Sequence, residues 1–184
     1  LKNNKRIAYD ICPVNMVLNC LANELGKEYD KNGEMAKSGK LNIELLKQLN
    51  ALSYYKMSSP KSLGYEWVND NIFSLLKNID IPTKELLRTI VEHIAFQISK
   101  HLIPSEKALF TGGGTHNTFL MERIKGLSNS EIIIPNKEII DFKEAIIFAF
   151  LGILRWRNET NVLKSVTGSN FDNIGGCIYN SLSF

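Results

Sequence analysis

The stretch ALFTGGGTHNTFLMERI, residues 108–124, contains the feature that decides the fold. Its apolar start, Ala108–Phe110, is followed by glycines at positions 112–114 and then by the amphipathic segment Thr118–Ile124. This order predicts a strand, a glycine turn and a helix. Glycines permit positive φ and a close approach of the backbone to a ligand, and a helix N-terminus favours anions. A nucleotide is the ligand that this pattern suggests.

Two interpretations of the glycine turn remain open, nucleotide contact and a plain tight turn. The dinucleotide fingerprint G-x-G-x-x-G requires a glycine where Asn117 stands, and the P-loop requires G-K-[ST], which this stretch does not contain. His116 could contact phosphate, but a histidine in a turn is more commonly solvated. The residues alone support both interpretations equally.

The composition favours a globular protein and gives no sign of a nucleic-acid partner. Of 184 residues, 44% are hydrophobic, and 22 Lys and Arg against 19 Asp and Glu leave a net charge of +3. No run of Lys or Arg is longer than the pair at positions 5 and 6, so we expect no nucleic-acid binding. The three cysteines lack C-x-x-C spacing and do not cluster with the three histidines, which argues against a zinc site or a disulfide framework.

The ends of the chain and its longest apolar run bear on its location. The run Ala145–Leu154 is too short to cross a bilayer, so we expect no membrane segment. No signal-peptide pattern is present at the start, which favours the cytoplasm. The chain begins with Leu1 followed by polar residues, and this beginning suggests a piece of a longer protein.

The spacing of apolar residues and of caps predicts several helices in the first half of the chain. They are a helix from Asn15 to Gly26, a short one after Asp30, one over Ile43–Leu49 with Asn42 as N-cap, one over Tyr65–Leu76, and a long one between Pro82 and Pro104. In the long helix, an apolar stripe is predicted to face the core while Glu92 and other charged residues face away. His93 and His101 are expected on its polar side or flank.

Strands are fewer than helices. Lys107–Phe110 and Glu131–Ile134 bracket the glycine turn and its helix, which predicts a βαβ unit with parallel strands. Arg6–Tyr9 also has a strand-like pattern, and Phe142–Leu154 is apolar nearly all round, which predicts a buried helix. The predicted fold class is therefore α/β, rich in helix, with too few strands for a complete sheet.

Two acidic residues are candidates for contact with a ligand. Asp10 ends the predicted first strand, and ligands of open α/β sheets bind at the carboxyl ends of strands. A turn leading to a helix capped by Asn15 explains Asp10 equally simply, and local physics favours that explanation. Glu144 lies in an otherwise apolar helix, where it either hydrogen-bonds a polar ligand such as a sugar or profits from the nearby helix N-terminus. Asp141 has the same two explanations.

Taken together, these segments resemble motifs of the anhydro-N-acetylmuramic acid kinases. In the first half, DICPVNM at 10–16 resembles D-x-G-P-G-N-M, GKEYDKNG at 26–33 resembles G-K-x-Y-D-K-D-G, and PKSLGYE at 60–66 resembles P-K-S-T-G-R-E. In the second half, TGGGTHN at 111–117, KEA at 143–145, Phe148-Ala149, Asn161 and SVTG at 165–168 follow in the family's order and at similar spacing. The resemblance runs from one end of the chain to the other.

The resemblance implies the helix-rich C-terminal lobe of an actin-like, ribonuclease H-like ATPase fold. Residues 1–184 would form this single lobe, and the N-terminal lobe would be absent. Kinases of this family use ATP, Mg²⁺ and water to open 1,6-anhydro-N-acetylmuramic acid and phosphorylate O6, which yields N-acetylmuramic acid 6-phosphate for peptidoglycan recycling in the bacterial cytoplasm. The expected ligands are thus ATP, Mg²⁺ and an anhydro-amino sugar.

The resemblance also implies roles for individual residues. The nucleotide would contact Gly112, Gly113, Gly114 and Asn117, with the glycine turn matching the motif on its adenosine side. The sugar would contact Glu144, and Asp10 and Asn15 would lie in the loop facing the phosphates and the metal. The family's catalytic base is an aspartate that is expected upstream of the segment matching Asp10. No catalytic residue is therefore assigned within this chain, the metal ligands stay unassigned, and we expect the chain to be inactive alone.

This sequence departs from the family pattern in the loop after Asp10. Cys12 and Val14 replace two glycines, which makes a close approach to phosphate harder, and β-branched Val14 disfavours a left-handed backbone. These departures leave room for an alternative function, a non-catalytic actin-like module that binds a nucleotide or a protein. A lobe that lacks its partner exposes apolar surface, so we also expect self-association or a homodimer.

Overall fold

The computed structural model of the protein describes residues 6–179. Its α-helices are α1 (Asn15–Glu24), α2 (Glu34–Ser38), α3 (Ile43–Ala51), α4 (Tyr65–Val68), α5 (Ser74–Lys77), α6 (Thr83–Ser99), α7 (Thr118–Leu127), α8 (Lys137–Trp156) and α9 (Lys164–Thr167). The strands are β1 (Lys107–Leu109) and β2 (Glu131–Ile133), and short 3-10 helices span Lys31–Gly33, Ser53–Lys56 and Gly113–His116. A π-helical segment, Asn69–Phe73, joins α4 to α5. The predicted helix over Tyr65–Leu76 is thus confirmed as one nearly continuous element.

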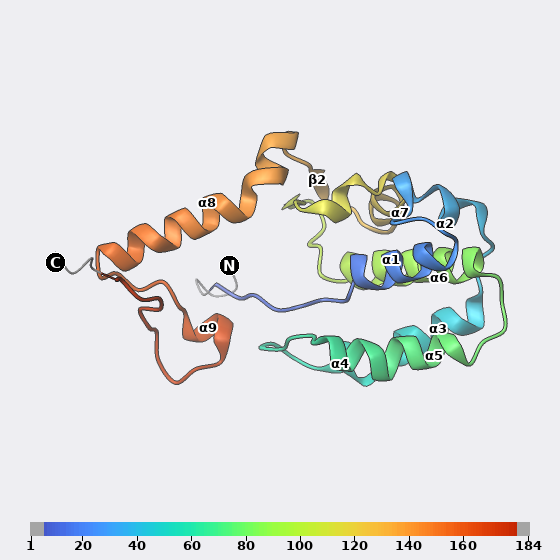
Figure 1. The fold of residues 1–184 in the computed structure, drawn as a ribbon, viewed down its shortest axis with the longest axis horizontal. Coiled ribbons are helices and arrows are strands. Elements are labelled where there is room, and N and C mark those ends of the chain that lie inside the picture. Colours follow the sequence, from blue (N-terminus) through green and yellow to red (C-terminus); the bar gives the residue numbers. More distant parts are fainter. Residues whose placement is uncertain (1–5, 180–184) are drawn as a thin grey trace.

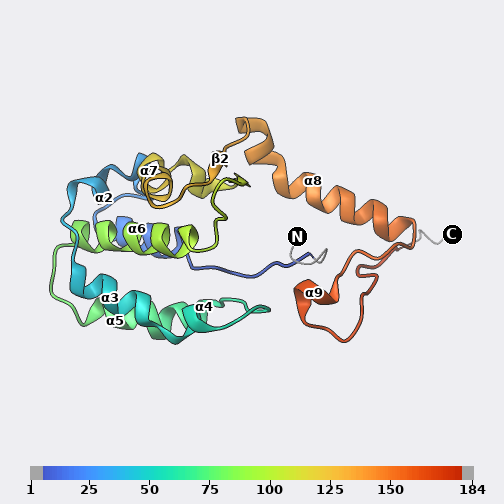
Figure 2. The same cartoon turned by 180° about the vertical axis from the view of Figure 1, so that it is seen from behind.

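The core of the molecule surrounds α6. This helix contacts α1, α2, α3 and α7, and its residues Leu87, Ile90 and Ile94 are almost completely buried. Figures 1 and 2 show α6 between two groups of helices, with α3, α4 and α5 on one side and α2 and α7 on the other. Burial of the apolar stripe of α6 against these helices contributes to the hydrophobic stabilisation of this body.

The βαβ prediction is confirmed. Strands β1 and β2 pair in parallel, with Lys107 opposite Glu131 and Leu109 opposite Ile133, and α7 lies between them in the sequence. This pair is the whole sheet of residues 6–179, so the prediction of an α/β fold with an incomplete sheet is also confirmed. The sequence pattern found this unit because its signals, a short apolar run, glycines and an amphipathic helix, are local.

Arg6–Tyr9, predicted as a strand, is not one. The segment runs as coil, and the Asp10 amide donates to Lys61 O at 3.3 Å, which among residues 6–179 is the single backbone bond between these two loops. A strand requires a neighbouring strand to bond with, and the described residues place none beside this segment. The alternating pattern alone did not reveal this missing neighbour.

The prediction of a buried helix over Phe142–Leu154 is correct in its secondary structure and wrong in its burial. Helix α8 forms, but none of its residues is buried. It points away from the body around α6 in both views (Figures 1 and 2). The segment that follows α8 returns along it, where Asn161 Nδ2 donates to Leu151 O at 3.3 Å and Arg155 Nε donates to Gly176 O at 3.0 Å. An apolar helix is buried only if a partner covers it, and no other described element covers this one.

Two residues of α6 also differ from expectation. Glu92, predicted to face away from the core, is buried, and it pairs with Arg88 at 2.8 Å and with Arg123 of α7 at 2.9 Å. His93, predicted on the polar side, is buried as well and bonds Asn50 and Tyr55. Both buried side chains are hydrogen-bonded to polar partners, and these bonds offset the cost of removing polar groups from water. Across residues 6–179, no helix combines the length and apolarity needed to cross a membrane.

Candidate functional site

The glycine turn follows β1 and begins a 3-10 helix at Gly113. Gly112 has φ of 87°, a conformation that favours glycine, and its carbonyl accepts hydrogen bonds from Thr115 N at 3.0 Å and Thr115 Oγ1 at 2.8 Å. Gly113 and Gly114 are the first residues of the 3-10 helix, so their amides have no acceptor within it. The turn therefore presents two free backbone N–H groups, which is a typical arrangement for binding an anion.

Asn15, the first residue of α1, lies against this turn. A Cβ built on Gly113 would be 3.4 Å from Asn15 Nδ2, and one built on Gly114 would be 3.7 Å from Val14 Cγ1. The two regions are almost a hundred residues apart in sequence, so their contact is a tertiary feature. The structure thus brings together Asn15 and the glycine turn, which sequence analysis assigned to one ligand.

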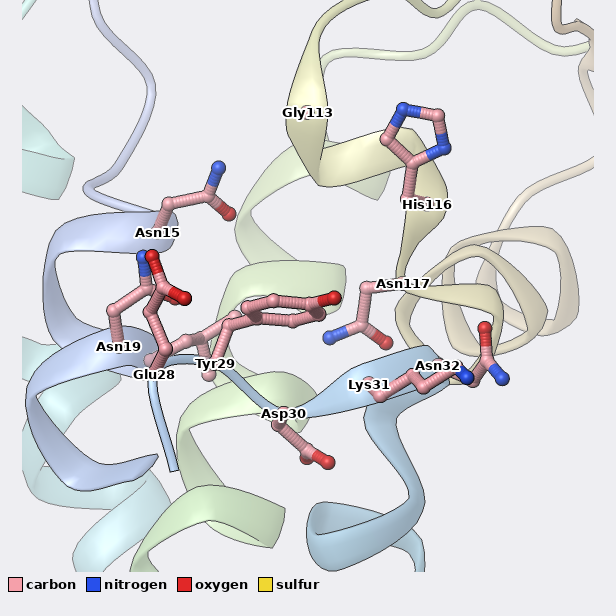
Figure 3. Close-up of a pocket in the computed structure, with 11 residues that line it drawn as sticks. Asn15, Asn19, Glu28, Tyr29, Asp30, Lys31, Asn32, Gly113, His116 and Asn117 are labelled. Carbon is pink, nitrogen blue, oxygen red and sulfur yellow. The ribbon is translucent and has the colours of Figure 1, made fainter. Parts of the chain in front are cut away.

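A cavity of about 410 Å³ opens beside this contact. It is lined by Asn15, Leu18, Asn19, Glu28, Tyr29, Asp30, Lys31, Asn32, Gly113, His116 and Asn117. Figure 3 shows the ring of Tyr29 in the middle of these residues, with Asn15 and Asn19 of α1 on one side and Asn117 on the other. An apolar ring among several amide groups suits a flat, polar ligand of the size of a nucleoside.

Sequence analysis assigned no role to the loop residues of this cavity. Glu28, Tyr29 and Asn32 belong to the segment resembling G-K-x-Y-D-K-D-G, which was the signal that could have identified them. Asp30 of the same loop has a structural role, because its two carboxylate oxygens accept from Met35 N and Ala36 N at 2.9 Å each. The capping bonds of Asp30 hold the start of α2 and so fix the loop that forms one wall of the cavity.

Asn117 links this wall to α7. Its Oδ1 accepts from Leu120 N at 2.9 Å and so caps α7. Gly33, with φ of 74°, lies directly against it, since a Cβ on Gly33 would overlap Asn117 Oδ1 and would be 2.7 Å from Phe119 Cβ. Asn117 is therefore held in place from two sides, with its amide available to the cavity (Figure 3).

Asp10 lies outside this cavity. It lines a neighbouring hollow of about 460 Å³ together with Cys12, Val14 and Leu63. Its Oδ2 accepts from Leu63 N at 2.8 Å and its carbonyl accepts from Tyr54 OH at 2.6 Å, so the loop is firmly held while the side chain is exposed. Asp10 and Asn15 thus lie at opposite ends of one loop. Asp10 borders one hollow, and Asn15 borders the adjacent cavity.

The residues that replace the family's glycines pack against the protein and also line the hollow beside Asp10. Cys12 and Val14 are half-buried and pack against the hydrophobic core. Burial raises the pKa of the Cys12 thiol to about 12, so this thiol stays protonated at neutral pH. Because both side chains also line the hollow beside Asp10, they occupy space that two glycines would leave open.

Glu144 is exposed on α8 and does not line the cavity beside the glycine turn. The preceding residue, Lys143, is half-buried, and its Nζ would be 3.8 Å from a Cβ built on Gly112. Helix α8 therefore lies beside the glycine turn at Lys143. The side chain of Glu144 leaves the helix about 100° further around its axis. The sequence alone gives Lys143 no role beyond its place in the KEA motif. Within residues 6–179, no group of three or more His, Cys, Asp or Glu side chains is arranged to hold a metal ion.

Comparison with known proteins adds the identity of the family. The family model described as anhydro-N-acetylmuramic acid kinase matches residues 1–181. The anhydro-N-acetylmuramic acid kinase of Sulfurovum sp. is 34% identical over 180 residues, which cover 94% of this chain and 50% of that protein. The kinase of the same name from Pasteurella multocida is 33% identical over 193 residues, which cover 97% of this chain and 50% of that protein. The chain spans about half the length of these curated relatives, and it belongs to the anhydro-N-acetylmuramic acid kinase family.

Proposed function

We propose that this chain forms the nucleotide-binding C-terminal lobe of an actin-like kinase that opens 1,6-anhydro-N-acetylmuramic acid and phosphorylates it. The product would be N-acetylmuramic acid 6-phosphate, an intermediate of peptidoglycan recycling in the cytoplasm. The observation that carries this proposal is the meeting of Asn15 with the free amides of Gly113 and Gly114 beside a cavity of about 410 Å³. Family membership supplies the reaction class.

In this proposal the nucleotide lies in the cavity of Figure 3, with its phosphates near Asn15 and the amide of Gly113. Gly113 lines this cavity, whereas Gly112 and Gly114 line the hollow next to it, so no side chain of these glycines crowds the phosphates. The side chain of Asn117 is positioned to hydrogen-bond the nucleoside. ATP supplies the phosphoryl group, and Mg²⁺ offsets the charge of the phosphates. Mg²⁺ commonly uses one or two carboxylates together with the phosphates, so the single exposed carboxylate of Asp10 fits such a role without a cluster of acids.

The sugar is proposed to contact Glu144. Its carboxylate is exposed on α8, and it would accept hydrogen bonds from sugar hydroxyls that the rest of the kinase brings into place. The catalytic base is still expected upstream of this chain. A mechanism of this kind depends on positioning, because phosphoryl transfer needs the nucleophile and the phosphate to be held in line.

Calorimetric titration of the 184-residue chain with magnesium ADP tests the nucleotide site. We expect saturable binding that Gly113→Val abolishes, because the Cβ alone would already touch Asn15 Nδ2 at 3.4 Å and the two methyl groups beyond it would crowd Asn15 and fill the turn. Gly126→Val is the matched control, since a side chain at Gly126 meets no atom within 4 Å. Binding that survives the first substitution, or that both substitutions remove equally, would contradict the proposed location.

The reaction itself is tested by supplying the first half of the Sulfurovum kinase in trans. We expect phosphorylation of the anhydro sugar only when both halves are present. Asp10→Asn in the mixture should lower the rate about 10²-fold or more, because this substitution removes the carboxylate proposed to hold Mg²⁺ beside the phosphates. If the acid limb of the pH–rate profile disappears with Asp10→Asn, Asp10 itself is the base, and the expectation of an upstream base is wrong.

The alternative is a non-catalytic actin-like module that binds a nucleotide or a protein. Cys12 and Val14 in place of glycines favour it, since the loop beside Asp10 has lost two sites of close backbone approach. Nucleotide binding together with no phosphorylation after complementation by a folded partner half would support this alternative over the kinase.

A further inference from the structure

Lys143 stands over the glycine turn without a charged partner. Its Nζ would be 3.8 Å from a Cβ on Gly112, although 30 residues separate the two in sequence. Among residues 6–179, Lys143 forms no ion pair, whereas Lys107 on β1 has Glu131 within 3.9 Å and Lys37 has Glu122 within 3.2 Å. The half-buried Lys143 therefore brings an uncompensated positive charge to this turn.

Other donors around the turn are also uncommitted. The amides of Gly113 and Gly114 have no acceptor in their 3-10 helix, and they donate to no side chain of the described residues. Asn15 Nδ2, 3.4 Å from the position of a Gly113 Cβ, also donates to no described atom. Lys143 Nζ beside Gly112, the amides of Gly113 and Gly114, and Asn15 Nδ2 beside Gly113 are thus uncommitted donors along one turn. The carboxylate nearest in sequence to Lys143, that of Glu144, is directed about 100° away around the helix.

We propose that Lys143 binds the phosphates of the nucleotide and so makes the site select a nucleoside diphosphate or triphosphate over a nucleoside. This inference rests on the proposed nucleotide-binding function, and it assigns to α8 a direct part in nucleotide recognition. Lysine is a common phosphate ligand because its ammonium group is a compact charge on a flexible stem. The amides of the turn fix the position of the phosphate, and Lys143 supplies the charge.

The experiment compares Lys143→Gln with the parent chain, using ADP, adenosine and pyrophosphate as ligands in calorimetric titrations. We expect the substitution to weaken ADP about 10-fold or more and to leave adenosine within about 2-fold, because only the phosphates lose a charged partner. The dependence of ADP affinity on salt should also decrease. Lys137→Gln, at the exposed start of the same helix, removes the same charge and should change neither ligand.

The outcomes separate this inference from the proposed function. Parent binding of ADP that Lys143→Gln leaves unchanged, or equal losses for ADP and adenosine, would overturn the inference and keep the nucleotide site. Pyrophosphate binding that depends on Lys143, without any binding of ADP or adenosine, would keep the anion site and reject the nucleotide function. A parent that binds none of the three ligands would overturn both. Circular dichroism and a thermal melt confirm that each variant is folded.

Discussion

At the scale of single residues, Gly33 controls the position of Asn117. A side chain at Gly33 would overlap Asn117 Oδ1, and φ of 74° is unfavourable for any other residue. We expect Gly33→Ala to destabilise the protein by about 2–4 kcal/mol and to weaken nucleotide binding, because Asn117 must move. Urea denaturation and ADP titration measure the two effects.

Gly26 provides the matched control for this prediction. Its φ is 72°, but a side chain there meets no atom within 4 Å. Gly26→Ala should therefore cost only about 1–2 kcal/mol, the strain of the left-handed backbone, and should leave ADP binding intact. Equal losses for the two variants would show that contact with Asn117 is unimportant.

The buried imidazole of His93 makes stability depend on pH. Its Nδ1 lies 2.8 Å from Asn50 Oδ1, which can only accept, so Nδ1 carries the proton and Nε2 accepts from Tyr55 OH at 2.9 Å. Burial, and then the charge of Lys100, lower the pKa of His93 to about 4. Because this pKa lies below its value near 6.5 in the unfolded chain, stability is fully present above pH 6.5 and is lost as the pH falls toward 4.

We therefore expect the free energy of unfolding to fall by about 2 kcal/mol between pH 7 and pH 5, from this group alone. Urea denaturation at both pH values measures the difference. Glu92 does not contribute in this range: burial raises its pKa, but hydrogen bonds from Arg123 and Arg88 outweigh burial and lower it overall. His93→Gln should remove most of the slope, and an unchanged slope in that variant would assign it to other groups.

At the scale of elements, Glu92 joins α6 to α7. Its carboxylate accepts hydrogen bonds from Arg88 Nη1 of its own helix at 2.8 Å and from Nε and Nη2 of Arg123 in α7 at 2.9 Å each. Only 10% of the Glu92 side chain is exposed. We expect Glu92→Gln to cost about 3–5 kcal/mol, because it leaves two arginines without their partner in a poorly solvated place. Chemical denaturation measures this loss.

The ion pair of Lys37 with Glu122 is the control at this scale. It also joins α7 to a neighbouring helix, but its side chains are 61% and 60% exposed. Glu122→Gln should cost less than about 1 kcal/mol, as exposed pairs do. A comparable cost for both substitutions would mean that the buried pair is not a particular link between α6 and α7.

The elements also show what the sequence could predict. Asn42 was predicted as a cap because a capping residue acts on an amide three residues away, and it accepts such a bond at 2.9 Å. The cap predicted at Asn15 is wrong, since Asn15 is the first residue of α1 and no side chain among the described residues caps this helix. The burial of Glu92 was not predictable, since it depends on Arg123, 31 residues further along the chain. The same limit applies to the site: the glycine turn was found from its pattern, whereas Lys143 reaches it only through the path of α8.

At the scale of the whole molecule, α8 is the main exposed apolar surface. Phe148 and Trp156 are 70% and 77% exposed, and Phe142, Ile146, Phe150 and Ile153 are exposed as well. Exposed patches of this size commonly mark contact surfaces, so we expect the 184-residue chain to self-associate. Phe148→Lys should shift light scattering toward the monomer at high concentration without lowering stability.

Tyr65→Lys is the comparison for this prediction. Tyr65 is 60% exposed at the start of α4, away from α8, and its substitution should leave the association unchanged. A parent chain that stays monomeric at high concentration would contradict the prediction for α8.

The half-buried thiol of Cys12 also makes the loop beside Asp10 a natural reporter of motion. Cys20 and Cys177 are exposed and should react quickly with a disulfide reagent at neutral pH, whereas Cys12 must first leave the interior to ionise. The rate of the slow third phase of thiol labelling would then report how often this loop opens, and the measurement needs no attached probe. A ligand bound beside the loop would lengthen that phase, so a simple colorimetric assay would follow the closure of the site.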